Sequence, residues 1–277
     1  MAFFISAFMN TQSTSNKKVQ RAWVMYDWAN SVYSLVITST IFPVYYNAVT
    51  QGVDGSDKVS FFGWEVVNTV LYSYSISFSF LVIALLAPLL SGIADASGNK
   101  LNFMKFFVYL GSLSCISLYF FTGENLEFGI ICSVLASIGF SGSIVFYNSY
   151  LPEIAKEEEF DLLSAKGFAL GYIGSVILLV FNLVTIQYPE WFGMPSGSFA
   201  PRFAFLVTGV WWIGFAQIPF RILPNNPYKK SISTDYLWRG YREVTQVFRE
   251  LRSIPVANQF LASFFFYSMG VQTVMYL

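Results

Sequence analysis

The sequence contains no histidine and few charged residues. Charged residues make up 12% of its 277 residues and hydrophobic residues 55%, whereas about a quarter of a typical soluble domain is charged. Without histidine, no imidazole can serve as a metal ligand, an acid–base catalyst or a proton relay. The composition therefore predicts an all-α, polytopic membrane protein, and we expect neither a metal centre nor a cofactor.

Cysteine is scarce and nucleotide-binding motifs are missing. Cys115 and Cys132 lie inside apolar runs without the C-x-x-C spacing of zinc or redox sites, so we interpret them as packing residues. No G-x-x-x-x-G-K-[ST] loop occurs, so the sequence does not predict nucleotide hydrolysis. An intramembrane enzyme would need clustered catalytic groups, but Asp27 is the one acidic residue near the interior of an apolar run. We expect no enzymatic activity and no nucleic-acid partner.

Long apolar runs, in contrast, are abundant. Six windows can cross the roughly 30 Å of bilayer hydrocarbon as helices; they cover residues 23–46, 69–90, 103–121, 128–151, 167–188 and 203–222. A further run, 258–277, reaches the last residue. The predicted organisation is a disordered arm (1–20), a six-helix transmembrane bundle (21–222), a linker with an amphipathic helix (223–256) and the start of a second bundle (257–277). We expect the chain to be truncated after a seventh span.

Lysine and arginine lie almost entirely in the amino-terminal arm and in the second, fourth and sixth connections, with Lys58 and Arg202 as the exceptions. Basic residues accumulate in cytoplasmic loops. We therefore expect a multi-pass protein of the bacterial cytoplasmic (inner) membrane with its amino terminus inside. The charged helix expected over 233–253 would lie along the inner membrane face, as a linker or as a regulatory partner site.

The first span carries WVMYDWANS at 23–31, in which Asp27 and Asn30 share one helix face. An ionisable group inside a span is by default a functional-site hypothesis, facing the bundle interior or a watery cavity. The alternative places Asp27 at the headgroup level, with Tyr26 and Trp28 as interfacial anchors. Because its carboxyl group can gain and lose a proton, Asp27 is also the candidate for coupling to protons.

Four further polar residues lie in or at the ends of later spans: Tyr147, Asn148, Asn182 and Gln217. Together with Asp27 and Asn30, they are the candidates for substrate binding or coupling.

The fifth span has a face of glycines. Gly167, Gly171 and Gly174 recur at i, i+4 and i+7, and small residues at such intervals let two helices approach closely. We predict that they pack against a partner helix.

The connection between the second and third spans reads SGIADASGNK at 91–100, with Asp95, Gly98 and Lys100 at the offsets D-x-x-G-x-K. A plain surface turn would look similar. We expect Asp95 just before the third helix, where an anion meets the positive end of the helix dipole. This predicts a conformational switch that latches the turn and performs no chemistry.

Six spans, a basic linker and a further span resemble one half of a major facilitator superfamily transporter, which is built from nested three-helix repeats. That superfamily carries G-x-L-A-D-R-x-G-R-K in this turn. The chain agrees at Ala94, Asp95, Gly98 and Lys100 and departs at Ser91, Ala96 and Asn99. Three more specific stretches resemble the vacuole-effluxer, autophagy-related branch and its bacterial relatives: YDWANS at 26–31, YNSYLPEIA at 147–155 and AKGFALGYIGS at 165–175.

The resemblance implies a secondary active transporter that moves a small solute by alternating access, with amino-acid efflux the activity associated with the fungal members. The alternatives are a non-transporting membrane receptor or scaffold, or a transporter of another small-solute class. The expected partners are the solute, the lipid bilayer, protons as coupling ion, and the missing carboxyl-terminal half of the same protein. Without that half, we expect the chain to insert into the membrane but not to transport.

Overall fold

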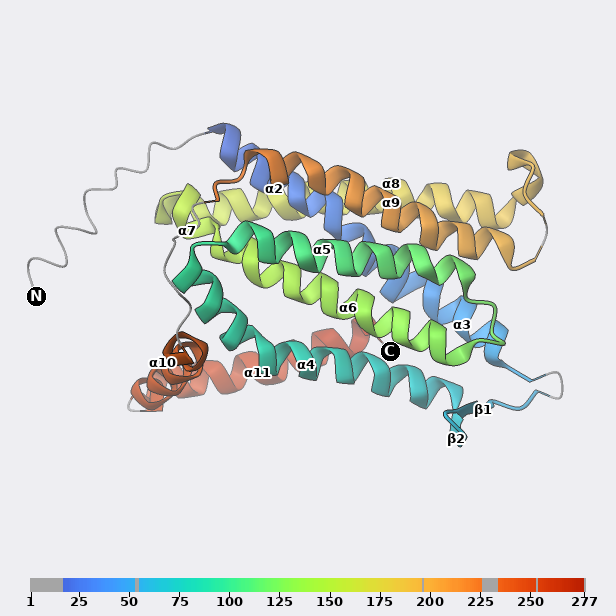
Figure 1. The fold of residues 1–277 in the computed structure, drawn as a ribbon, viewed down its shortest axis with the longest axis horizontal. Coiled ribbons are helices and arrows are strands. Elements are labelled where there is room, and N and C mark those ends of the chain that lie inside the picture. Colours follow the sequence, from blue (N-terminus) through green and yellow to red (C-terminus); the bar gives the residue numbers. More distant parts are fainter. Residues whose placement is uncertain (1–16, 53–54, 196, 226–233, 253, 277) are drawn as a thin grey trace, which may run out of the picture.

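The computed structural model describes residues 17–52, 55–195, 197–225, 234–252 and 254–276. Six helices in these ranges are long and apolar enough to cross a membrane: Lys17–Thr50, Asn68–Gly92, Lys100–Phe120, Leu126–Ile154, Glu157–Gln187 and Phe199–Ile222 (Figure 1). Each overlaps one of the six predicted windows. The all-α, multi-pass fold class is confirmed.

The first span consists of three segments: α2 (Lys17–Val32), the π-helix η1 (Tyr33–Ile41) and α3 (Phe42–Thr50). Residues 17–20, which the sequence analysis assigned to a disordered arm, are helical. The π-helix was not predicted. It ends two residues before Pro43. The ring of a proline inside an α-helix clashes with the carbonyl one turn earlier, and the wider π turn shifts the backbone hydrogen bonds that precede Pro43. Such segments are rare and frequently lie at functional sites.

The remaining elements follow in order. They are α4 (Asn68–Ser97), α5 (Lys100–Ser117), η2 (Leu118–Phe120), α6 (Leu126–Ser149), α7 (Leu151–Ile154), η3 (Glu157–Glu159), α8 (Phe160–Gln187), η4 (Pro189–Phe192), α9 (Phe199–Ile222), α10 (Thr234–Arg252) and α11 (Pro255–Tyr276). Within the bundle, α2 packs against α8 and α9, α5 against α6 and α9, and α4 against α6. At the α5–α6 crossing, Gly139 lies directly against the backbone of Gly111, which allows the two helices to approach closely.

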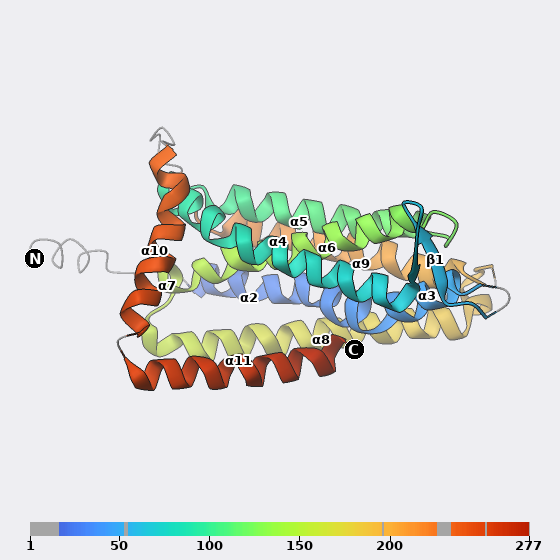
Figure 2. The same ribbon diagram turned by 90° about the horizontal axis from the view of Figure 1, so that it is seen from below.

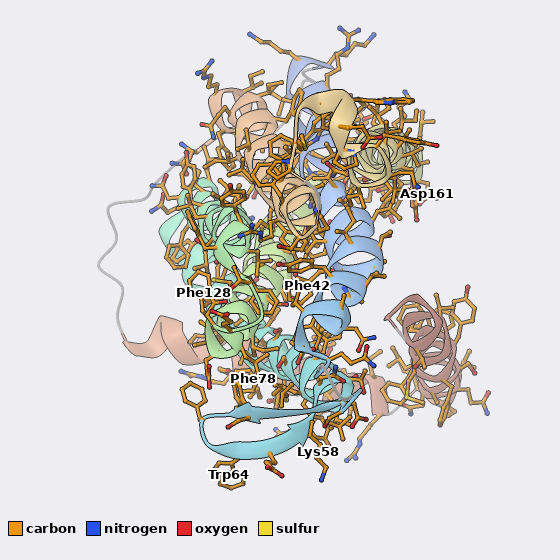
Figure 3. The ribbon with its side chains drawn as sticks, turned by 90° about the vertical axis from the view of Figure 1, so that its right-hand side faces the viewer. Phe42, Lys58, Trp64, Phe78, Phe128 and Asp161 are labelled. Atoms are coloured by element: carbon orange, nitrogen blue, oxygen red, sulfur yellow. The ribbon has the colours of Figure 1, made fainter. Side chains whose placement is uncertain are left out.

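A short β-hairpin follows the first span at one end of the bundle. Its strands, β1 (Lys58–Phe61) and β2 (Trp64–Val67), pair antiparallel. The turn residues Phe62 and Gly63 both have positive φ, as type I′ two-residue hairpin turns require. Figure 3 looks onto this end: Trp64 points outward, whereas Phe42 lies among the helices. This hairpin was not predicted from the sequence.

The two last helices lie outside the six-helix bundle. Helix α10 crosses the end of the bundle opposite the hairpin (Figure 2) and packs on α4, where the Tyr241 hydroxyl donates to the Leu85 carbonyl. Helix α11 then runs back along the bundle and contacts it mainly at η1. It forms the predicted helix but is not among the six described helices that qualify as membrane spans.

Candidate functional site: a polar cavity between α2, α6 and α8

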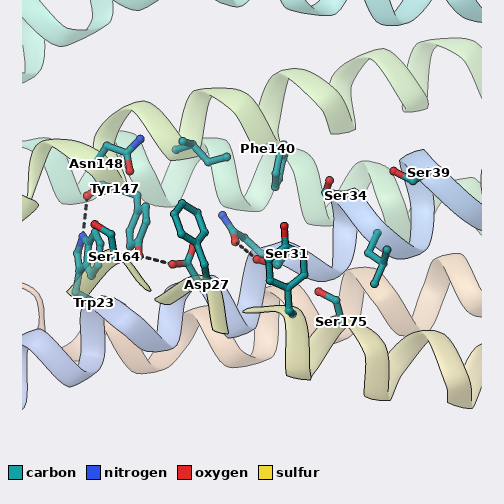
Figure 4. A pocket seen from close by; sticks show the side chains of 15 residues that line it. Trp23, Asp27, Ser31, Ser34, Ser39, Phe140, Tyr147, Asn148, Ser164 and Ser175 are labelled. Atoms are coloured by element: carbon teal, nitrogen blue, oxygen red, sulfur yellow. Dashed lines mark hydrogen bonds between the residues drawn. The ribbon is translucent and has the colours of Figure 1, made fainter. Parts of the chain in front are cut away.

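A cavity of about 320 Å³ lies between the first span, α6 and α8 (Figure 4). Among the described residues that line it, Asp27 is the only charged one. Serine hydroxyls supply much of its polar surface: Ser31, Ser34, Ser39, Ser164 and Ser175. Aromatic rings form much of the remaining wall: Trp23, Phe140, Tyr147, Phe168 and Tyr172.

Asp27 and Tyr147 form the central polar contact of this cavity. The Tyr147 hydroxyl donates to Oδ2 of Asp27 at 2.7 Å, and the two residues are 7% and 4% exposed. A buried carboxylate is costly unless it is hydrogen-bonded, and a hydrogen bond to an ionised group is among the stronger ones. Asp27 therefore points into the bundle.

Trp23 holds Tyr147 in place. The Trp23 indole stacks on the Tyr147 ring with centroids 4.3 Å apart and planes 12° apart. Its Nε1–H donates to the Tyr147 main-chain carbonyl at 2.9 Å. One turn of α2 thus supplies both the carboxylate and the side chain that orients its hydrogen-bond donor.

The glycine face of α8 lies against the same part of α2. A Cβ atom on Gly167 would collide with Oδ2 of Asp27, and one on Gly171 with the Ser31 hydroxyl. At Gly174 an added Cβ would lie 2.9 Å from the Trp28 ring. Larger residues at these positions would separate the two helices, so the glycines set the distance between Asp27 and α8.

The structure brings four of the six predicted substrate or coupling residues together. Asp27, Asn30, Tyr147 and Asn148 all line the cavity, and Asn30 also accepts a hydrogen bond from the Ser31 hydroxyl at 3.4 Å. The other two lie elsewhere.

Asn182 is fully buried in α8 and does not line the cavity; in the described part of the chain its side-chain amide makes no hydrogen bond. Gln217 lies on α9, where it donates to the Ile213 carbonyl at 2.8 Å and accepts from Tyr109 at 3.4 Å.

Most of the cavity wall was not predicted from the sequence. Ser164, Phe168, Tyr172 and Ser175 follow one face of α8 beside the glycines. Their spacing of three to four residues was visible in the sequence. Serines and aromatics are common in membrane helices, however, so only the position of Asp27 distinguishes this face from others.

The turn after α4 is arranged differently from the expectation. Helix α4 continues to Ser97 and ends at Gly98, which has the left-handed φ of 64°. Asp95 therefore belongs to the last turn of α4 and does not directly precede α5; its side chain lies outside the described residues. Lys100 forms an ion pair with Glu153 of α7, with Nζ and Oε1 2.6 Å apart. Glu153, inside YNSYLPEIA, was not predicted as a partner of the turn.

Comparison with known families decides the classification of the chain. A family model described as "Vacuole effluxer Atg22 like" matches residues 15–277. The chain belongs to the Atg22-like vacuole effluxer family. The predicted resemblance to this branch of the major facilitator superfamily is thereby confirmed.

Two relatives illustrate the range of this family. The chain is 33% identical over 260 residues to the uncharacterized MFS-type transporter YxiO of Bacillus subtilis, a match that covers 93% of this chain and 58% of YxiO. It is 22% identical over 361 residues to autophagy-related protein 22 of Coccidioides immitis, with 96% and 59% covered. The chain thus spans less than two thirds of these relatives. No solved structure matches it.

Proposed function

We propose that this chain forms the solute-binding bundle of a secondary active transporter, which exports a small solute by alternating access. The observation that carries the proposal is the cavity around Asp27. Its volume of about 320 Å³ lies at the lower end of the roughly 300–1,000 Å³ typical of small-molecule sites. The family description as effluxers and the description of YxiO as an MFS-type transporter support the same activity.

The cavity favours a solute that carries an ammonium group. Asp27 offers a carboxylate, and no lysine or arginine is found among the described lining residues. The aromatic walls add faces that attract cations, and serine hydroxyls can accept or donate further hydrogen bonds. Amino acids and small amines meet these requirements. Amino acids are therefore the first class to test.

We further propose protons as the coupling ion. The Asp27 carboxylate accepts from Tyr147, and the same oxygen atoms can bind either a proton or the ammonium group of a solute. A protonated Asp27 loses most of its attraction for a cation. Competition between proton and solute for one carboxylate would couple the inward movement of one to the outward movement of the other.

Alternating access requires a second wall for this cavity. In major facilitator proteins, the site lies at the interface of two bundles that rock against each other. The six helices described here would form one of these bundles, with the α4–α5 turn and its Lys100–Glu153 pair as a latch at one end.

Flux measurements in proteoliposomes containing the full-length protein test the proposal. We expect pH-gradient-driven movement of at least one member of a panel of radiolabelled amino acids and small amines. Asp27→Asn should abolish this flux, whereas Asp57→Asn, which removes an exposed carboxylate near the hairpin, should retain it. If no solute of the panel moves with intact protein, the proposal of amino-acid or amine export is contradicted, which leaves a transporter of another small-solute class or a receptor or scaffold.

The proposed orientation has its own test. Cysteines introduced by Asn99→Cys or Thr245→Cys should react with membrane-impermeant reagents only from inside sealed cells, because the turn and α10 lie at the same end of the bundle. A cysteine introduced by Lys58→Cys at the hairpin end should react from outside. The reverse pattern would contradict an amino terminus in the cytoplasm.

A further inference from the structure

A second groove lies beside the contact between α2 and α8, on the side opposite the Asp27 cavity. It has a volume of about 830 Å³ and shares no lining residue with the Asp27 cavity. On α8, Phe168 and Tyr172 line the cavity, whereas Lys166, Leu170 and Ile173 line this groove. Successive helical residues are about 100° apart, so these two sets fall on opposite sides of the glycine face.

One end of the groove is basic. Lys17 and Arg21 approach it from the first turns of α2, and Lys166 approaches it from α8. In the described ranges no carboxylate lies within ion-pair distance of these three side chains. Among the described lining residues the one acidic residue is Glu159, whose Oε2 accepts hydrogen bonds from the Gln20 side chain and the Lys156 amide.

The rest of the groove is apolar and continues along two membrane-spanning helices. Val24 and Met25 of α2 and Leu170 and Ile173 of α8 line it. Ile173 is 53% exposed and lies within a predicted span. An apolar groove wall beside three cations matches the two parts of a lipid, a charged headgroup and an apolar acyl chain.

We infer that this groove binds one anionic phospholipid, whose phosphate contacts Lys17, Arg21 and Lys166 and whose acyl chain lies between α2 and α8. Basic pockets between transmembrane helices recognise such headgroups. A soluble anion would not use the apolar part, and a zwitterionic lipid would gain less from three cations. This inference does not depend on the proposed transport activity, because it rests on a different surface and different residues.

The test is a lipid titration of the full-length protein in a neutral detergent. Binding of phosphatidylglycerol is read by native mass spectrometry and by the rise of the thermal unfolding midpoint. Each basic residue near an anionic headgroup contributes about fivefold in affinity. The variant Lys17→Gln/Arg21→Gln/Lys166→Gln should therefore bind on the order of 100-fold more weakly.

A control variant with the same loss of charge separates the groove from general electrostatics. Lys58→Gln/Lys105→Gln/Lys156→Gln removes three cations that do not line the groove and should bind phosphatidylglycerol nearly as well as the unmodified protein. If both triple variants lose affinity equally, the inference is overturned. Should the groove variant fail to fold, Lys166→Gln alone must still weaken binding about fivefold.

Two competitors distinguish the lipid from other ligands. Phosphatidylcholine should compete poorly, and inorganic phosphate at millimolar concentration should not displace phosphatidylglycerol. Equal binding of phosphatidylcholine would show that the three cations do not select the headgroup. Full displacement by phosphate would reveal a plain anion site without an acyl-chain groove, and either result would contradict the inference.

Discussion

The Asp27–Tyr147 contact and the Lys100–Glu153 pair have similar lengths, 2.7 and 2.6 Å, but opposite surroundings. Asp27 and Tyr147 are buried inside the bundle. The Lys100 and Glu153 side chains lie at its end and are 16% and 47% exposed. Exposed ion pairs are typically worth about 0–1 kcal/mol, whereas removing one partner of a buried polar pair costs about 1–3 kcal/mol.

The difference suggests separate roles. A carboxylate inside a membrane bundle is costly, and the glycine face of α8 is shaped to make room for it. A weak surface pair can open and close with little change in free energy, as a latch must. The cavity is therefore the candidate for solute binding, and the turn is the candidate for controlling the rate of conformational exchange.

The largest expected effect comes from filling the space beside Asp27. Gly167→Leu places a side chain where even a Cβ atom would meet the carboxylate, and overpacking costs about 1–3 kcal/mol or more. We expect a clearly lower thermal unfolding midpoint in detergent and loss of solute binding. Gly214→Leu is the matched control, because nothing lies near an added Cβ there. Equal destabilisation by both variants would contradict the role of the glycine face.

A smaller effect is expected when the buried contact loses its donor. Tyr147→Phe keeps the ring that stacks on Trp23 but leaves Asp27 without the hydroxyl, which should cost about 1–3 kcal/mol of stability. Chemical unfolding of the variant measures this cost. Tyr172→Phe removes an exposed hydroxyl from the same cavity and should be nearly neutral. A similar loss of stability in both variants would mean that the hydrogen bond from Tyr147 to Asp27 does not stabilise the fold.

The smallest effect is expected at the turn. A double-mutant cycle of Lys100→Gln and Glu153→Gln should give a coupling free energy below about 1 kcal/mol, and it should fall further as salt is raised. Unfolding of the four proteins at two salt concentrations provides the measurement. A salt-independent coupling of several kcal/mol would show that this pair stabilises the fold and does not act as a latch.

The spans, the family and the glycine face could be predicted from the sequence, because they depend on local patterns. Apolar length marks a span, and Gly167, Gly171 and Gly174 fall on one face wherever the helix packs. Which distant residues these segments contact in the folded bundle could not be predicted. Glu153 is 53 residues from Lys100, and only the packed bundle brings them together.

Local conformation was also harder to predict where competing rules apply. The π-helix at Tyr33–Ile41 interrupts a span that is otherwise regular, and Pro43 was its only signal. The end of α4 was placed too early because Asp95 and Gly98 both favour a turn, whereas the helix continues until the left-handed Gly98. Asn182 and Gln217 are polar like the cavity residues, but no sequence feature showed that they face other parts of the bundle.

Equilibrium binding of a transported solute to two variants tests the central claim most directly. Asp27→Asn removes the one charge among the described cavity residues and should raise the dissociation constant about tenfold or more, as expected for loss of a hydrogen bond to a charged group. Lys100→Gln should leave that constant unchanged and alter only the rate of transport. If Asp27→Asn binds normally, or if Lys100→Gln weakens binding to the same extent, the assignment of solute binding to the cavity is contradicted.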